Sequence, residues 1–472
     1  MKHKLGICIP YRNRKEHLEQ LIPSLSKHLE KQGIEFGFYV GHQVDEKLFN
    51  RGAMKNIAAE FAFRDGCDYV AFHDVDMLPI NDSCDYSYPE EFPIHISTKL
   101  SKYNYGLGYD QYFGGVVLFN KEHIEKTNGY SNDYWDWGQE DDDLFWRCYF
   151  EGYTTGKIFK KYENKPYAKF NGESSVMILP INRKISSCLD KDHTVSILFK
   201  ADQKENVPIW LVGDKHKEFV EYPLLRKNGC WSYGMSFNNS RAVTMTLYDE
   251  KNTFWYNYGK RFEGMWTWAT MSYSEKESSV YFYINNELVR NMNGVVESLP
   301  FPIGRELKKQ NFTDPFLLGF CNYTKTHYKG LISEVKILNK FYPPEEVGKV
   351  FNDKNLDTVL HYDFKGDDVA DKISGLIAEG MDVDFDNEDI EVVENVLPYR
   401  KDGEFFCLPH QDEGYVNGTW FKGETTARNE RRLVTQMQQR KINYKSDGMN
   451  SLKYELVNTE QNNKCLMINV KL

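Results

Sequence analysis

The sequence predicts an α/β layered domain that is interrupted by an all-β sandwich. Residues 1–165 alternate short apolar runs with amphipathic segments, which is typical of an α/β domain. From 188 to 364 the pattern changes to short alternating strands separated by turn residues, which indicates a sandwich. With 472 residues, the chain is also long enough for two or three domains.

These patterns set the expected domain boundaries. The α/β domain is expected in two pieces, residues 1–170 and 396–472, with the sandwich inserted at 185–366. Alternating runs at 194–199, 266–271 and 279–284 are the clearest strands of the sandwich. The acidic stretch 367–395 is expected to be a linker that returns the chain to the first domain.

The elements of the α/β domain follow from its apolar periodicity. Strands are expected at 5–9, 36–40, 69–72 and 112–119, and helices at about 53–63 and 141–150. Apolar residues at helical spacing predict a further helix between the first two strands: Leu18, Leu21, Ile22, Leu25 and Leu29. In the second piece, a polar loop around His410 precedes a helix near 429–440 and a strand pair between 452 and 470.

Composition and charge exclude several classes of function. A net charge of -10 argues against nucleic acid as a partner, because binding the phosphate backbone needs a basic surface. The nine cysteines are scattered singly, so neither a zinc knuckle nor a disulfide framework is visible and a reducing compartment is expected. The apolar run near the first residue leaves no room for a signal peptide, and no apolar stretch of about 20 residues predicts a transmembrane helix. The sequence therefore predicts a soluble, cytoplasmic protein.

The first candidate for chemistry follows the strand at 69–72. Asp74 and Asp76 are two residues apart, so in extended backbone their carboxylates point the same way. Chemistry in open α/β sheets lies at the carboxyl ends of strands, and hard oxygen ligands suit Mn²⁺ or Mg²⁺. A metal held there could also bind the diphosphate of a sugar nucleotide. An ordinary acidic turn explains an isolated pair of this kind equally well.

A second candidate is the run WDWGQEDDD at residues 135–143. Its two tryptophans can cover a sugar ring, its glycine permits close approach, and its four consecutive acids open a helix. Stabilisation of the helix dipole, about 0.3–1 kcal/mol for each acid, explains one or two of the acids but not four. Glycosyl transfer needs one carboxylate to take the proton of the attacking hydroxyl and others to orient sugar hydroxyls.

Two aromatic and basic segments are candidates for binding phosphate or a base. Arg12 and Arg14 follow the first strand and could contact phosphates or a uracil, while Tyr11 packs on the base. Phe49 and Arg51 form a similar pair. Exposed arginines are common in loops, so each segment alone leaves the question open.

Together these segments resemble the β-1,4-galactosyltransferase family. The matching stretches are 9–14 (IPYRNR), 49–51 (FNR), 74–76 (DVD), 95–97 (HIS), 111–116 (QYFGGV), 128–130 (NGY) and 135–143 (WDWGQEDDD). Their order and spacing agree with the family over residues 1 to about 165, and the likeness resumes over 396–472 through SDGMNSL at 446–452. The middle of the chain resembles a laminin-G-like or concanavalin-type domain, through YKGLISEVKIL at 328–338.

The resemblance implies a fold and an activity. The fold is a Rossmann-like GT-A glycosyltransferase domain interrupted by an all-β jelly-roll sandwich. The activity is an inverting, Mn²⁺-dependent transfer of galactose from UDP-galactose to a hydroxyl of a saccharide acceptor, with Mg²⁺ as the alternative metal. Transfer from UDP-GalNAc, UDP-GlcNAc or UDP-glucose stays open, as does a lectin-like protein whose transferase half is inactive.

The resemblance also assigns roles to residues. Asp141 would be the catalytic base, and Asp76 would hold the metal with His410 and, in place of a family methionine, Cys407. The residues implied along the UDP-sugar donor are Pro10, Tyr11, Arg12, Arg14, Phe49, Arg51, Asp74, Lys102, Tyr112, Trp137 and Glu140. The residues implied at the acceptor are Gly115, Trp137, Gln139 and Asp142.

Two features of the resemblance bear on specificity. Tyr112 falls where the family uses a tyrosine to exclude the N-acetyl group of GalNAc, which supports galactose as the donor sugar. Asp136 and Gln139 stand where family members that glycosylate GlcNAc have glycines. Side chains at these positions would enter or re-polarise the acceptor cleft, which favours xylose, glucose or another sugar over GlcNAc.

Overall fold

The chain forms two compact units, which are described separately. The first contains described residues of 1–155 and 396–472, and the second those of 156–208 and 215–395. The computed structural model describes residues 3–107, 111–136, 138–180, 182–189, 191–201, 221–227, 233–238, 243–248, 253–258, 265–277, 279–288, 299–300, 315–321, 326–352, 354–365, 369–373, 375–394, 396–409, 415–416, 419–420, 429 and 444–472.

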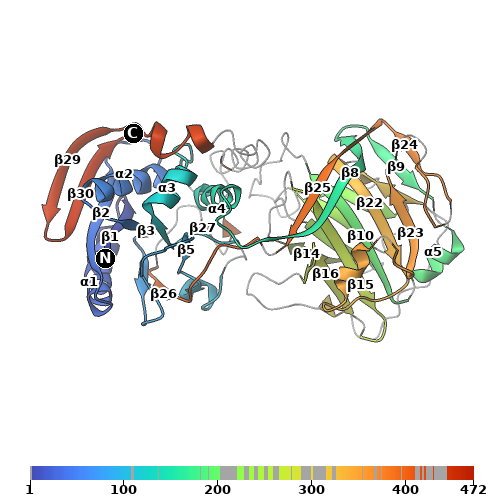
Figure 1. Cartoon of the computed structure of the whole chain (residues 1–472), viewed down its shortest axis with the longest axis horizontal. Helices are drawn as coiled ribbons and strands as arrows, with labels where there is room; N and C mark the ends of the chain where they lie inside the picture. Colours follow the sequence, from blue (N-terminus) through green and yellow to red (C-terminus); the bar gives the residue numbers. More distant parts are fainter. Residues whose placement is uncertain are drawn as a thin grey trace. The chain divides into compact units, whose positions relative to one another are not determined.

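The first unit is built on a seven-stranded sheet in the order β29-β30-β2-β1-β3-β7-β5 (Figure 1). Its strands are β1 (Lys4–Tyr11), β2 (Glu35–Gln43), β3 (Tyr69–His73), β5 (Ile94–His95), β7 (Val116–Asn120), β29 (Glu455–Asn462) and β30 (Cys465–Lys471). The centre is parallel, since β1 pairs with β2 and β3 and β2 pairs with β30. The strand β7 runs antiparallel to β3. The C-terminal piece therefore completes the sheet that the N-terminal piece begins.

Helices and short strands surround this sheet. The helices are α1 (Lys15–Lys31), α2 (Arg51–Arg64), α3 (Lys121–Thr127) and α4 (Glu140–Phe150), with short 3-10 turns η1 (Ser101–Tyr103), η3 (Tyr444–Ser446) and η4 (Met449–Ser451). The helix α2 packs against β1 and β2, and Asn50 caps it by accepting a hydrogen bond from the backbone N–H of Ala53. A small sheet joins β4 (Met77–Pro79) and β6 (Lys99–Leu100) to β26 (Glu404–Cys407).

The second unit consists mainly of two antiparallel sheets. One has the order β17-β16-β15-β10-β22-β8-β25, with β18 and β23 attached, and the other β14-β13-β12-β11-β19-β9-β24. Apolar side chains of β10, β15 and β22 meet those of β9 and β19 to form the core between the sheets. A second cluster, which includes Trp268 and Leu338, contains side chains that point to the opposite face of the same strands.

The elements of the second unit have the following bounds. The strands are β8 (Lys157–Asn171), β9 (Val176–Leu179), β10 (His193–Ala201), β11 (Glu221–Lys227), β12 (Tyr233–Asn238), β13 (Val243–Tyr248), β14 (Thr253–Tyr258), β15 (Thr267–Ser274), β16 (Ser279–Ile284), β17 (Glu287–Leu288), β18 (Leu299–Pro300), β19 (Phe316–Leu318), β20 (Phe320–Cys321), β21 (Thr326–His327), β22 (Lys329–Leu338), β23 (Thr358–Asp363), β24 (Glu379–Met381) and β25 (Val383–Glu394). The helix α5 (Arg183–Cys188) and the 3-10 turn η2 (Val347–Phe351) complete it. A short pair in the first unit, β27 (Tyr415–Val416) and β28 (Thr419–Trp420), is also described.

The stretch that was expected to be a linker, 367–395, contains strands instead. β25 pairs with β8 along nearly its whole length, and β24 pairs with β9. In β25, Val383 and Phe385 pack on the core between the sheets, whereas Ile390 and Val392 join the second cluster. A register shift between Glu388 and Ile390 accounts for the change of face. The acids between these apolar residues gave the segment the composition of a linker.

The limits of the sandwich and one strand also differ from expectation. The second unit begins at 156 and ends at 395, wider than the expected 185–366, because β8 and β25 belong to it. The strand expected at 112–119 begins only at Val116, since Gly115 has a φ of +80°, which extended backbone does not allow. Of the predicted helix at 429–440, all but residue 429 lies outside the described residues.

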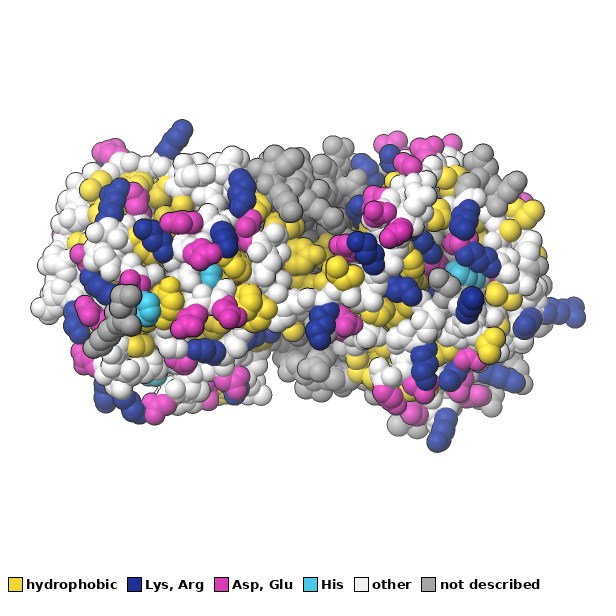
Figure 2. Space-filling model, in the orientation of Figure 1, with side chains coloured by type: hydrophobic (Ala, Val, Ile, Leu, Met, Phe, Trp, Pro, Cys, Tyr) yellow, Lys and Arg dark blue, Asp and Glu magenta, His cyan; other side chains and the backbone are white. Residues whose placement is uncertain are grey.

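Figure 2 shows the charged side chains on one face of each unit. Lysine and arginine side chains are interspersed there with aspartate and glutamate. A mixed surface of this kind is typical of a folded protein in water.

Candidate active site

Asp74 and Asp76 lie in the turn that follows β3. The backbone N–H of Asp74 donates to the carbonyl of Gly115 at 2.9 Å, which fixes the turn to the start of β7. The backbone N–H of Leu408 donates to the carbonyl of Asp76 at 2.8 Å. The turn is thus held on one side by the N-terminal piece and on the other by the C-terminal piece.

Asp141, in the first turn of α4, faces this turn across a buried lysine. Lys55 of α2 places its Nζ 3.1 Å from Oδ1 of Asp74 and 3.4 Å from Oδ1 of Asp141. The hydroxyl of Tyr130 also donates to Oδ1 of Asp141, at 3.1 Å. The side chain of Lys55 is 1% exposed, whereas those of Asp74 and Asp141 are 30% and 23% exposed. The two carboxylates therefore reach the surface and the ammonium does not.

The surroundings of Asp141 raise the pKa of its carboxyl group to about 7. Burial is the main cause, because removal from water disfavours the charged form. The ammonium of Lys55 opposes this, and the neighbouring acids Glu140, Asp74 and Asp142 add to the increase. Burial disfavours the charge of Lys55 as well, but the carboxylates of Asp141 and Asp74 keep the pKa of Lys55 well above its usual value. A carboxyl group poised near neutral pH is suited to act as a base.

Gly114 leaves room for Asp141 and Tyr112. A Cβ atom at Gly114 would lie 2.5 Å from Oδ2 of Asp141 and 3.0 Å from the hydroxyl oxygen of Tyr112. The carbonyl of Gly114 accepts hydrogen bonds from Nε2 of His95 at 3.0 Å and from the hydroxyl of Ser97 at 2.8 Å. Burial holds the pKa of His95 well below its usual value, so the ring is neutral and serves to fix this turn.

A Cβ atom on Gly115 would point into the protein. It would lie 2.4 Å from Met77 and 2.6 Å from the hydroxyl of Ser97. Together with the positive φ, this contact accounts for a glycine at the position. The acceptor role that was expected for Gly115 can therefore involve only its backbone.

Phe49 lies between two guanidinium groups, which come from separate segments. The Cζ atom of Arg12 is 5.5 Å from the centre of the Phe49 ring and that of Arg51 is 5.8 Å from it. Arg12 donates to the carbonyls of Gln43, Lys47 and Asp45, which fixes it to the loop after β2. These interactions bring together the two aromatic and basic segments that the sequence analysis singled out.

Glu140 and Gln139 stand beside this group at the start of α4. Nη1 of Arg51 lies 3.8 Å from the Glu140 carboxylate and donates to the carbonyl of Asp136 at 2.9 Å. Asp136 and Gln139 both have a positive φ, +68° and +80°, a conformation that glycine adopts more readily than residues with a side chain. The Gln139 side chain is buried and that of Asp136 is exposed.

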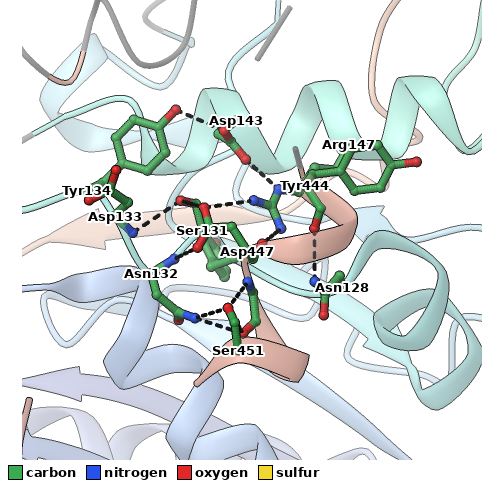
Figure 3. Close-up of polar contacts among 12 residues, drawn as sticks. Asn128, Ser131, Asn132, Asp133, Tyr134, Asp143, Arg147, Tyr444, Asp447 and Ser451 are labelled. Atoms are coloured by element: carbon green, nitrogen blue, oxygen red, sulfur yellow. Dashed lines mark hydrogen bonds and ion pairs between the residues drawn. The ribbon is translucent and has the colours of Figure 1, made fainter. Parts of the chain in front are cut away.

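The fourth acid of the block, Asp143, has a different environment. It is buried, and its carboxylate accepts from Nε of Arg147 at 2.5 Å and from the hydroxyl of Tyr134 at 2.8 Å. Figure 3 shows Arg147 between Asp143 and Asp447, and Nη1 of Arg147 donates to the Asp447 carbonyl at 2.7 Å. Asp447 in turn accepts from Ser131, so this cluster ties the C-terminal segment to α4. Asp143 therefore has a structural role, unlike Asp141.

The other predicted residues are placed as follows. Pro10 and Tyr11 end β1, Arg14 precedes α1, and Lys102 lies in η1 with its Nζ 5.3 Å from the centre of the Tyr103 ring. Asp142 follows Asp141 in α4 and is partly exposed. Trp137 and His410 lie outside the described residues.

Cys407, at the end of β26, is a poor candidate for a metal ligand. Its sulfur contacts the sulfur of Met77 at 3.5 Å, and burial raises the pKa of the thiol. Sulfur is also a softer ligand than Mn²⁺ prefers. Within the described part of the chain, which excludes His410, no cluster of three or more acidic, histidine or cysteine residues has the geometry of a metal site.

Three residues of the site were missed in the sequence analysis: Lys55, Tyr130 and Gly114. Lys55 lies in a helix that mixes apolar residues with the polar residues Arg51, Asn56, Glu60 and Arg64, and a lysine in such a helix is expected to reach the surface. Tyr130 and Gly114 were read only as parts of matching stretches. A charged residue at a buried position of α2 was the one signal that could have revealed Lys55.

Known proteins similar to this chain were found by sequence and by structure. Residues 1–89 match the N-terminal region of glycosyl transferase group 7, and residues 94–169 match the N-terminal domain of galactosyltransferase. The chain is 43% identical over 148 residues to β-1,4-galactosyltransferase 7 of Drosophila melanogaster, over 31% of this chain and 44% of the fly protein. It is 40% identical over 157 residues to human β-1,4-galactosyltransferase 1, over 33% of this chain and 39% of the human protein. The chain thus spans less than half the length of the curated relatives it matches.

Among solved structures, the catalytic domain of the Drosophila enzyme in complex with xylobiose aligns with a TM-score of 0.29. The aligned part is 38% identical and covers 32% of this chain and 62% of that one. A mutant of the same Drosophila enzyme has also been solved in complex with manganese, UDP-Gal and xylobiose.

The expected cytoplasmic location is wrong. The β-1,4-galactosyltransferases that the chain matches are type II membrane enzymes of the Golgi, so the family points away from the cytoplasm. The scattered cysteines and the apolar first strand, on which the expectation relied, describe the folded domain and carry no information on its compartment. Among the helices of the described residues, none is long and apolar enough to cross a membrane.

Proposed function

The chain belongs, through residues 1–169, to the glycosyl transferase group 7 family of galactosyltransferases, and from that premise we propose that it is an inverting galactosyltransferase. It would move galactose from UDP-galactose to a hydroxyl of an acceptor sugar in a β linkage. The first unit would be a Rossmann-like GT-A domain and the second an inserted jelly-roll of the laminin-G type. The observation that carries the proposal is the partly exposed carboxylate of Asp141, with a pKa of about 7, beside the Asp74–Asp76 turn.

The reaction follows from the position of Asp141. The acceptor hydroxyl oxygen would form a bond to C1 of galactose while the bond from C1 to the diphosphate oxygen breaks. The proton of the hydroxyl would pass to the Asp141 carboxylate, and UDP would leave with the electron pair. A single displacement of this kind inverts the configuration at C1. Because the pKa of Asp141 is near neutral, the group can accept the proton and later release it to water.

We propose Mn²⁺ as the metal, with Mg²⁺ as the alternative. The carboxylate of Asp76 and the imidazole of His410 would hold it, while the contact of Cys407 with Met77 speaks against the thiol as a third ligand. Bound there, the metal would neutralise charge on the diphosphate as UDP leaves. The proposal rests on the ligand atoms of these residues, above all on the Asp76 carboxylate, because hard oxygen ligands suit both cations.

The donor would lie along the segments that converge at the starts of α2 and α4. Asp74 would contact galactose, and Tyr112 would exclude a donor with an N-acetyl group. The residues proposed along UDP are Pro10, Tyr11, Arg12, Arg14, Phe49, Arg51, Lys102 and Trp137. The contact of Arg51 with Phe49 supports this group, since a guanidinium pairs well with phosphates, while Arg12 is held by backbone carbonyls and would position the Phe49 ring.

The acceptor would meet Gly115, Trp137, Gln139 and Asp142, while Glu140 would contact the donor. Gln139 and Asp136 keep a glycine-like backbone while adding side chains, so the cleft is narrower or more polar than one with glycines. This favours xylose, glucose or another sugar without an N-acetyl group as the acceptor. A lectin-like protein is the alternative, but a binding protein has no need for a carboxylate that is poised near neutral pH.

The proposal is tested by measuring UDP release from UDP-galactose, UDP-GalNAc, UDP-GlcNAc and UDP-glucose with MnCl₂. Each donor is combined with xylosides, glucosides and GlcNAc glycosides as acceptors. We expect release from UDP-galactose that depends on both metal and acceptor. Binding of sugars without UDP release from any donor would instead support the lectin-like alternative.

Binding of UDP to Asp76→Ala, measured with and without MnCl₂, tests the metal site. We expect loss of metal-dependent UDP binding, because the variant removes the anionic ligand of a site with few others. Asp82→Ala is the matched control, since Asp82 is an exposed acid of the same unit that pairs with Lys31. Unchanged Mn²⁺ dependence of UDP binding in Asp76→Ala would show that the metal lies elsewhere.

A further inference from the structure

Lys55 is a buried cation that contacts three oxygen atoms. Its side chain is 1% exposed, and its Nζ lies 3.1 Å from Asp74, 3.3 Å from the hydroxyl of Tyr130 and 3.4 Å from Asp141. The ammonium group has three N–H donors, and these three oxygens match that number. An isolated buried charge is strongly unfavourable, so the contacts with these oxygens hold the ammonium group of Lys55 in place.

The two oxygens of Asp141 have different surroundings. Both hydrogen bonds that the structure records to this carboxylate, from Lys55 and from Tyr130, reach Oδ1. Oδ2 instead lies over Gly114, only 2.5 Å from the position that a Cβ atom would take there. The hydroxyl of Tyr112 is 3.0 Å from the same position. Oδ2 therefore lies against Gly114, in the place that a side chain there would take, and beside the residue proposed to select the donor sugar.

We propose that Lys55 is a positioning residue of this site: it occupies Oδ1 of Asp141 together with Tyr130, so that Oδ2 takes the proton of the acceptor hydroxyl. The inference rests on the proposed transferase function. It places the attacking hydroxyl of the acceptor next to Gly114 and Tyr112. It also gives α2, whose first residue Arg51 is proposed to lie along UDP, a part in orienting the base.

The charge of Lys55 also helps Asp141 to act as a base, because it favours the ionised carboxylate. Asp141 faces Asp74 from the turn after β3 and Glu140 and Asp142 from its own helix, all of which disfavour its ionised form. Lys55 opposes them, while Arg51 lies 3.8 Å from Glu140. Without Lys55, Asp141 would keep its proton to a higher pH and would be a base only in more alkaline solution.

The test is the pH dependence of kcat and KM for Lys55→Met in the full chain, with UDP-galactose, MnCl₂ and the best acceptor of the panel above. Met has a similar length and no charge. We expect kcat at pH 7 to fall by about tenfold or more, and the acidic limb of the profile to move up by about one to three pH units. Activity should recover at high pH, which a merely misfolded variant would not show. Lys31→Met, which removes an exposed lysine paired with Asp82, is the matched control and should behave as wild type.

If Lys55→Met does not fold, Tyr130→Phe provides the second measurement, since it removes the other donor to Oδ1 and keeps the ring. We expect a lower kcat, an unchanged KM for UDP-galactose and a shift of the acidic limb in the same direction. An active wild type together with unchanged profiles in the folded variants would overturn the role of Lys55 and leave the transferase function standing. A wild type that releases no UDP from any donor would overturn the proposed function and this inference with it.

Discussion

Each unit buries a lysine and carboxylate cluster, and the two clusters differ in charge and exposure. In the first unit, the single ammonium of Lys55 lies between the carboxylates of Asp74 and Asp141, which are partly exposed. In the second unit, the single carboxylate of Glu334 is 0% exposed and contacts Lys165, Lys336 and His361. Nζ of Lys336 is 2.5 Å from Oε1 of Glu334, and Nε2 of His361 is 2.9 Å from the same oxygen.

The difference distinguishes a reactive cluster from a structural one. Burial, together with the neighbouring carboxylates, holds the pKa of Asp141 near 7, and the partial exposure of its side chain leaves an oxygen available to a substrate. For Glu334, burial alone would raise the pKa, but the hydrogen bond from His361 and the charges of Lys336 and Lys165 lower it far below its usual value. Glu334 is thus permanently ionised and enclosed, which suits a charge that stabilises the sheet and does no chemistry.

The largest expected effect comes from breaking the enclosed cluster. Glu334→Gln would leave Lys336 and Lys165 without their carboxylate, and we expect the free energy of unfolding of the second unit to fall by about 3–5 kcal/mol. Urea unfolding followed by tryptophan fluorescence measures it, because Trp266 and Trp268 are buried in this unit. Glu346→Gln, which breaks more exposed pairs with Lys340 and Lys349, should lower the free energy of unfolding far less, because exposed pairs contribute little. Equal losses in the two variants would contradict the distinction.

The second-largest expected effect distinguishes the roles of Asp141 and Asp143, two acids of α4. Asp141→Asn should keep the fold and lower kcat by about 10²-fold, or about 2.7 kcal/mol, because Asn cannot accept the proton. Asp143→Asn should instead lower the melting temperature, since it weakens the buried pair with Arg147 (Figure 3). Steady-state kinetics and thermal unfolding on both variants check this. Wild-type turnover in Asp141→Asn would move the base to a neighbouring acid.

The pH dependence should have opposite signs in the two clusters. The folded-state pKa of Asp141 is raised from 3.8 to about 7, so the folded protein binds the proton more tightly and loses this stability as the pH rises through that interval. The folded-state pKa of Glu334 is lowered, so its contribution is present above the unfolded value of 4.5 and is lost only in stronger acid.

Two measurements check the sign that is expected for Asp141. For the wild type, kcat/KM should rise about tenfold per pH unit below pH 7 and level off above it, as a single base requires. Urea unfolding of Asp141→Asn relative to wild type should show a variant that gains relative stability as the pH rises from 4 to 8. A profile that is flat between pH 5 and 7 would show that Asp141 ionises in its usual range.

The sequence predicted the central strands β1, β2 and β3 and the helices α1, α2 and α4 of the first unit, because their apolar residues recur at clear spacing. Leu18, Leu21, Leu25 and Leu29 are buried as expected, and the strand pair at the C-terminus is present. β25 was missed because its acids alternate with apolar residues across a change of face, so that composition suggested a linker. A local pattern cannot show that a strand pairs with another more than 200 residues away.

The candidate site was predicted only in part for a similar reason. The motifs that contain Asp74 and Asp141 could be read because their residues are close together in sequence. Lys55 could not be assigned, since its partners come from β3, α4 and the segment after α3. The distinction between Asp141 and Asp143 likewise depends on Arg147 and Asp447, which only the fold brings together.

The smallest expected effect concerns the choice of the donor sugar by Tyr112, which lies beside the cluster of Lys55, Asp74 and Asp141 in the first unit. The hydroxyl oxygen of Tyr112 lies 3.0 Å from the Cβ position of Gly114, and its ring packs at an edge against His95, 5.6 Å between centres. The carbonyl of Tyr112 accepts from Arg400 at 3.2 Å, so the backbone is held in place and a smaller side chain should leave it there. Tyr112→Leu would open the space that an N-acetyl group needs.

We therefore expect Tyr112→Leu to raise the ratio of kcat/KM for UDP-GalNAc to that for UDP-galactose. The expected change corresponds to roughly 1–3 kcal/mol of activation free energy, the range that one steric element in a pocket supplies. The wild type should prefer UDP-galactose. Competition between the two donors, measured with both proteins, gives the ratio of kcat/KM directly. Tyr103→Leu is the matched control, because Tyr103 packs on Tyr112 at 6.3 Å and does not border Gly114. An unchanged donor ratio in Tyr112→Leu would mean that this side chain does not face the second carbon of the sugar.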